Sequence, residues 1–344
     1  MSAQSIAANP SQGTEHKRHR PVRSTKGISS APATAERNEI FEPFSLQQQR
    51  GTADLLPLHF ELQVLERYWQ DPAYRIHASH LQGSIVRRQR SAHSALNSVQ
   101  RVLPSFGFAD HSTQGRVVAV FISYLARLSA ADQQHWANHL IDAPCTTHAD
   151  YISLQLEGSW PTHRPVFEAC LLEMQEINQL SLGMQRAPLW QHTPNYAESS
   201  SAFGFLLRDS TESWHSFIEQ LFEYSIESLN SEFFEREQAY FQKQGIRHPL
   251  GMFSTWIRHA FCADDKAPVE HLLNTLKRIQ SEQFKPKAVR DSEQEKESYS
   301  HQQRQLMQEV YTALKTLRSI FALHPANQER KAPIDLDALQ VSFY

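Results

Sequence analysis

The amino-acid sequence predicts an all-α protein: a multi-helix bundle of roughly eight to ten helices, preceded by a disordered basic N-terminal segment. Three observations support this fold class. Glycine is scarce, at 11 of 344 residues, and good helix formers such as Leu, Gln, Glu, Ala and Arg dominate the chain. Beyond residue 40, apolar residues recur every three to four positions. We recognise no convincing run of alternating strands with hairpin turns.

The first 40 residues differ from the rest of the chain. They contain no Phe, Tyr or Trp, whereas the whole chain has six Trp, ten Tyr and nineteen Phe. This head has a net charge of +3, which leaves −6 for the body because the whole chain carries −3. A segment with so little to bury is predicted to be disordered. Its basic cluster is a candidate for binding an anionic partner and consists of Lys17, Arg18, Arg20 and Arg23.

We expect the chain to have four parts. They are a disordered head over residues 1–40, an N-terminal helical domain over 41–182, a linker over 183–201 and a C-terminal helical domain over 202–344. The linker is predicted from Pro188, Pro194 and a run of serines. The body is long enough to bury a core without disulfide bonds or a structural metal.

In the first half of the body, apolar spacing predicts five helices. They cover residues 57–69, 74–103, 115–128, 129–141 and 165–182. The stretch 115–128 is almost wholly apolar, which predicts a buried central helix. Ser129 is predicted to cap the helix that follows it, with Asp132 three residues later. The last of the five starts at Pro165, as is common for a first helical residue.

The second half contains the strongest helical pattern, over residues 211–244, with Gly245 as the predicted end. Aromatic residues surround more than one face of this predicted helix, and glutamates lie between them. A helix of this kind is either central to a bundle or partly covered by another chain. We therefore take Trp214, Phe222 and Phe233 as candidate partner-binding residues. Further helices are predicted near residues 251–262, 268–284 and 291–323.

One constellation has the composition of a metal site. Asp132, His135 and His139 are spaced i, i+3 and i+7, so they share one helix face. A turn at Pro144 can return the chain toward that face. The candidate zinc ligands are His135, His139, Cys145 and His148, a stereochemically possible tetrahedral set. The alternative is two exposed helix histidines followed by a loop. Apart from this zinc site, no cofactor is predicted.

The remaining residues suggest little chemistry. Three cysteines, an odd number with wide spacing, favour free thiols in a reducing compartment. No phosphate-binding glycine loop or Gly-x-Ser-x-Gly motif occurs. Glu173 and Glu176 lie one turn apart, and we interpret them as a solvated acidic face. The longest apolar stretch, residues 117–125, is too short for a membrane span, and the start lacks the apolar core of a Sec signal peptide.

These features favour a non-enzymatic helical protein that acts by protein–protein interaction or regulation in the cytoplasm. One interpretation of the head is a segment recognised by secretion machinery, which makes the chain a substrate or regulator of a bacterial specialised secretion system exported without a Sec-type signal. A second hypothesis is a helical enzyme with a zinc or buried cofactor site. A third is nucleic-acid binding through the basic head, although the acidic body argues against a broad binding surface.

Overall fold

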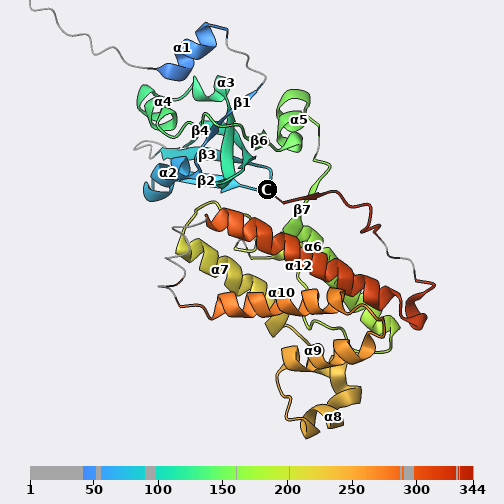
Figure 1. The fold of residues 1–344 in the computed structure, drawn as a ribbon. Coiled ribbons are helices and arrows are strands. Elements are labelled where there is room, and N and C mark those ends of the chain that lie inside the picture. The colour runs from blue at the N-terminus through green and yellow to red at the C-terminus, as the bar shows by residue number, and fades with distance from the viewer. Residues whose placement is uncertain are drawn as a thin grey trace, which may run out of the picture. The chain divides into compact units, whose positions relative to one another are not determined.

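Helices form only part of the fold, because the first half of the body is built around a β-sheet (Figure 1). The computed structural model describes residues 42–51, 56–89, 98–159, 161–200, 202–286, 289, 298–330, 332 and 334–343. The prediction of an all-α helical bundle is wrong. The fold is mixed, with a six-stranded antiparallel sheet and a small two-stranded sheet beside the helices.

The larger sheet has the strand order β1-β5-β4-β3-β2, with β6 also paired to β4. Its strands are β1 (Pro57–Phe60), β2 (Tyr74–Ala78), β3 (Gln82–Gln89), β4 (Ser98–His111), β5 (Gly115–Phe121) and β6 (Thr146–Thr147). Strands β2 to β5 form a meander, and β1 returns to pair with β5. The prediction of a helix over residues 74–103 is wrong, because the described parts of this range are β2, β3 and the start of β4.

Both faces of this sheet are covered. One face packs in a cluster that includes Phe60, Phe106, Phe108, Val118 and Trp136. The other packs in a cluster that includes Ala109, Val117, Ala119, Phe121 and Tyr151. Every residue of β5 is buried, so its sequence is a continuous apolar run that periodicity cannot separate from a buried helix. The helix predicted over residues 115–128 is instead β5 followed by the single turn α3 (Ile122–Leu125).

Two glycines let aromatic rings lie directly on the strands. A Cβ at Gly83 would come within 2.2 Å of the Phe106 ring, and a Cβ at Gly107 would come within 2.2 Å of the Tyr151 ring. Phe106 and Tyr151 are themselves fully shielded from solvent. The strands therefore use glycine where a neighbouring ring needs the space of a side chain.

Short helices cover the sheet. They are α1 (Pro43–Gln49), the 3₁₀ turn η1 (Leu62–Leu65), α2 (Glu66–Gln70), α4 (Ala130–Ala137) and α5 (Ala149–Glu157). The predicted cap of α4 is confirmed, because Ser129 accepts a hydrogen bond from the Asp132 amide at 3.2 Å. The predicted helix 57–69 is wrong at its start, where β1 precedes η1 and α2.

The second half of the body is helical, as predicted. Its long helices are α6 (Val166–Gly183), α7 (Thr211–Phe222), α9 (Pro249–Ala260), α10 (Ala267–Gln283) and α12 (Tyr299–Ala322). Helix α12 packs against both α6 and α10, and α10 packs against α7 (Figure 1). Among the described residues, no helix is both long enough and apolar enough to cross a bilayer.

The predicted long helix 211–244 is interrupted. Helix α7 passes into a π-helical turn, Glu223–Glu227, and the chain then breaks before η4 (Ser231–Glu237) and α8 (Gln238–Lys243). Leu189 and Trp190, in the segment before α7, provide the partners at this break. The Trp190 indole donates to the Ser225 carbonyl at 3.1 Å, and the Asn230 amide donates to the Leu189 carbonyl at 2.8 Å. A tertiary contact therefore overrides local helical preference here.

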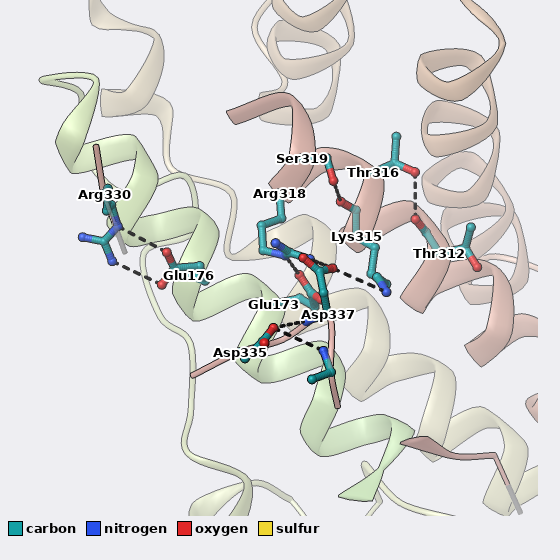
Figure 2. A network of polar contacts seen from close by, with 11 residues as sticks. Glu173, Glu176, Thr312, Lys315, Thr316, Arg318, Ser319, Arg330, Asp335 and Asp337 are labelled. Carbon is teal, nitrogen blue, oxygen red and sulfur yellow. Dashed lines mark hydrogen bonds and ion pairs between the residues drawn. The ribbon is translucent and has the colours of Figure 1, made fainter. Parts of the chain in front are cut away.

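The end of the chain crosses back over α6 and α12 (Figure 2). In the two-stranded sheet, β7 (Arg164–Pro165) pairs in parallel with β8 (Val341–Ser342). Arg318 bridges the buried Glu173 and the tail residue Asp337, each at 2.6 Å. Glu176 pairs with Arg330 at 3.2 Å. The interpretation of Glu173 and Glu176 as a solvated acidic face is wrong, because both carboxylates are buried against arginines.

Candidate functional site

A cavity lies at the end of the helical part where α8 and α9 meet α6. We call it the α8–α9 groove, and its volume is about 750 Å³. The last turn of α6, η4, α8, α9 and the 3₁₀ turn η5 (Pro325–Asn327) contribute its walls. Its aromatic floor is Tyr240, Phe241 and Trp256, and its polar rim includes Arg186, Arg236, Glu237, Thr255, His259 and His324.

The end of α6 forms one wall through a turn that usually contains glycine. The Arg186 amide bonds to the Ser181 carbonyl at 3.0 Å, and the Gln185 amide bonds to the Leu182 carbonyl at 2.9 Å. This pairing is a Schellman motif, and it places Gln185 in the left-handed region with φ of 57°. Helix α8 ends in the same motif with Gly245 at φ of 70°, so the predicted stop at Gly245 is confirmed.

These two turns give a paired prediction. Gln185→Gly is expected to raise the free energy of unfolding by about 0.5–1 kcal/mol, because glycine adopts the left-handed conformation without the steric cost of a Cβ. Gly245→Ala should lower it by about 1 kcal/mol for the converse reason. Urea unfolding of both variants measures the difference. A loss of stability in Gln185→Gly would show that the Gln185 side chain contributes more than its backbone strain costs.

Two arginines give the groove its electrostatic character. Arg186 makes a bidentate pair with Glu237, at 3.0 and 2.6 Å, and lies over the rings of Phe233 and Trp256. Arg236 donates to the Gln185 carbonyl at 2.7 Å and is exposed. Glu237 is the single acidic residue among the described residues that line the groove, and Arg186 neutralises it. Arg236 therefore leaves a net positive charge at the rim.

The lining side chains fit binding better than bond-breaking chemistry. The Thr255 hydroxyl donates to the Gly251 carbonyl at 2.9 Å, and one ring nitrogen of His259 bonds to the Thr255 carbonyl at 2.8 Å. The described lining residues therefore do not pair a hydroxyl or thiol with a base, the arrangement that activates a nucleophile. No known protein family, curated protein or solved structure matches this chain. The groove must therefore be interpreted from its own chemistry.

The candidate zinc ligands each have another partner. One ring nitrogen of His135 lies 2.9 Å from the Val64 carbonyl, and one of His139 lies 3.2 Å from a Glu61 carboxylate oxygen. The Cys145 thiol points to the Ala143 carbonyl. The His135 and His139 rings do lie side by side, with centroids 5.0 Å apart. Within the described ranges, however, no three His, Cys, Asp or Glu side chains are grouped to hold a metal ion.

His148 belongs to a different cluster, at the point where β8 meets α5. One of its ring nitrogens, Nδ1, accepts the Asp150 amide at 3.2 Å, and Nε2 lies 2.9 Å from the Ser342 hydroxyl. Burial lowers the pKa of His148 to about 4, so the ring is neutral at pH 7 and carries its proton on Nε2. Nε2 then donates to Ser342 and cannot take the serine proton. This Ser–His pair lacks the tautomer of a catalytic triad.

The nearby Asp150 is also used structurally. Burial alone would raise its pKa, but hydrogen bonds from His163 and Thr162 outweigh burial and lower the pKa to about 2. The carboxylate accepts both backbone amides and both side chains of that dipeptide. Asp150 therefore fixes the loop after α5 and is fully occupied by it.

The candidate partner-binding residues are not at a described surface. Trp214, Phe222 and Phe233 are all buried in the helical core. The basic cluster Lys17, Arg18, Arg20 and Arg23 lies outside the described residues. The groove residues were not predicted because they come from segments far apart in the sequence. Tyr240 is 43% exposed, but in the sequence it looks like any other aromatic residue of the helix predicted over residues 211–244.

Proposed function

We propose that this chain is a non-enzymatic interaction protein whose α8–α9 groove binds an acidic segment of a partner protein with one aromatic or long aliphatic side chain. The observation that carries the proposal is an aromatic floor combined with a positively charged rim in an open groove of about 750 Å³. Interfaces of this kind place an apolar anchor in a desolvated pocket and complementary charges at its margin.

Charge and exposure together favour this occupant. The body as a whole is acidic, yet Arg236 leaves a positive charge at this rim, beside the imidazoles of His259 and His324. Tyr240, in the floor, is 43% exposed. Apolar surface of this kind beside uncompensated positive charge suits a peptide that supplies both an apolar side chain and carboxylates.

Peptides selected from a random display library against the full chain test the proposal. The selected sequences should be enriched in Asp and Glu around one aromatic or aliphatic residue. In fluorescence anisotropy, Arg236→Glu should weaken binding of a selected peptide by at least about tenfold, which corresponds to about 1.4 kcal/mol. Tyr240→Ala should also weaken it. Arg247→Glu is the matched control, because Arg247 is exposed and does not line the groove.

The result has clear alternatives. Selected peptides without acidic enrichment would contradict the proposed chemistry. Equal binding to the wild type and to Arg236→Glu, or an equal loss in Arg247→Glu, would place the binding outside the groove. The cytoplasmic location stays a prediction. The role of the head in a specialised secretion system also stays one, since residues 1–40 lie outside the described ranges.

A further inference from the structure

A second site is independent of the groove and centres on Arg116 in β5. Its side chain is buried, with 5% of the residue exposed. The guanidinium lies over the Phe108 ring of β4, with its carbon 3.5 Å from the ring centroid, and over the Phe205 ring, at 4.2 Å. Stacking between two aromatic rings stabilises a desolvated cation but supplies no hydrogen-bond acceptor in the plane of the guanidinium.

Most of the hydrogen-bonding capacity of Arg116 is unused. One terminal nitrogen, Nη2, donates to the His80 carbonyl at 2.9 Å. Nε and Nη1 are shielded from solvent and have no acceptor among the described residues. The other well-buried arginines differ, since Arg186 pairs with Glu237 and Arg318 pairs with Glu173. A buried cation without an anion is costly, so an unpaired Arg116 indicates a missing partner.

The carboxylates on neighbouring elements bond to residues other than Arg116. Asp110, the residue opposite Arg116 in the β4–β5 register, pairs with Arg304 through one oxygen, and its other oxygen has no partner among the described residues. Asp150 is held by His163 and Thr162, as described above. Glu168 is paired with Arg164. Among the described residues, no carboxylate forms an ion pair with Arg116, so the guanidinium keeps its unused donors.

We propose that Arg116 is the primary ligand of a buried site for a small tetrahedral oxyanion of the phosphate type. The unused donors, Nε and Nη1, lie on different edges of the guanidinium plane, so they suit a tetrahedral oxyanion, which accepts hydrogen bonds on every side, better than a planar carboxylate. Access is through Phe205. This residue lines a surface cavity of about 310 Å³ and also covers the guanidinium, so a shift of one side chain connects the two.

The experiment measures thermal unfolding of the full chain in inorganic phosphate, with ionic strength held constant by sodium chloride. At about 10 mM phosphate, the unfolding midpoint of the wild type should rise by about 2–4 °C. Arg116→Met should abolish this rise. In phosphate-free buffer the same variant should unfold at the wild-type temperature or above it, because it removes an unpaired buried charge. A merely structural arginine would instead give a lower midpoint.

Controls separate this site from other sources of the response. Arg208→Met removes an exposed arginine that lines the same surface cavity and pairs with Glu66, and it should keep the response. If Arg116→Met does not fold, Arg116→Lys keeps the charge without the planar donors and should lose most of the response. Phenyl phosphate in place of inorganic phosphate distinguishes a phosphoryl group on a larger molecule from the free anion. No response in the wild type, or an equal one in Arg116→Met, overturns the proposal.

Discussion

Replacing Arg318 with methionine is expected to lower the free energy of unfolding by about 3–5 kcal/mol. Arg318 on α12 pairs with Glu173 on α6, and the Glu173 side chain is 1% exposed (Figure 2). Its second carboxylate oxygen has no hydrogen-bond partner among the described residues. Without Arg318 the carboxylate is left buried without a counter-charge, which costs far more than the loss of a surface ion pair. Urea unfolding at pH 7 measures the change.

The free energy of unfolding of Arg318→Met should depend more steeply on pH than that of the wild type. Burial raises the pKa of Glu173 above its ordinary value of 4.5, and Arg318 counteracts part of that rise. A carboxyl whose pKa is higher in the folded state binds more protons there, so stability falls as the pH rises through that window. Removal of Arg318 raises the pKa further. The stability deficit of Arg318→Met should therefore shrink at low pH.

Two further variants isolate the effect. Glu173→Gln combined with Arg318→Met removes the buried charge and should recover part of the loss and most of the pH dependence. Arg330→Met breaks the more exposed pair with Glu176 and should cost less. A decrease of less than about 1 kcal/mol in the free energy of unfolding of Arg318→Met would contradict a buried pairing, because exposed ion pairs contribute only that much.

The helical half was predictable because its signals are local. Helices α6, α9, α10 and α12 bury one face against a common core, so apolar residues recur at helical spacing within each segment. The caps at Ser129 and Gly245 are also local, since each depends on one residue and its own turn. The break at residues 228–230 was not local. It depends on Trp190 and Leu189, about 40 residues away.

The sheet was missed because polar and apolar residues do not alternate along its central strands β4 and β5. Strand β5 is buried on both faces, and β4 changes from partly exposed residues to a continuous buried run over residues 105–109. The hairpin between them contains a glycine, Gly115 at φ of 71°, but that single signal lies at the start of an apolar run that also suits a helix. Length alone could have favoured strands there, since the apolar run covers only seven to nine residues.

The α8–α9 groove and the Arg116 site could not be predicted from the sequence for a different reason. Their residues come from separate helices and loops, and none is unusual within its own segment. Arg116 follows a turn in the sequence and looks like a solvated residue, yet the fold buries it between two phenylalanine rings. Only the tertiary structure reveals that its partner is missing.

Gly83→Ala tests the sheet directly, because the two fold classes predict effects of opposite sign. In the helix predicted over residues 74–103, alanine would stabilise by up to about 1 kcal/mol relative to glycine. In β3, a Cβ at this position would lie 2.2 Å from the end of the Phe106 ring, which is fully buried and cannot move away freely. We expect Gly83→Ala to lower the free energy of unfolding by about 1–3 kcal/mol, measured by urea unfolding.

Matched variants make the sign informative. Gly251→Ala lies in α9, where the new Cβ would meet only the flexible Ile246 side chain at 3.2 Å, and it should change stability by less than about 1 kcal/mol. Phe106→Leu combined with Gly83→Ala should cost less than the sum of the two single changes, because the shorter side chain leaves room for the Cβ. Strict additivity would mean that the ring and the glycine are not in contact, and stabilisation by Gly83→Ala would favour the helix over the strand.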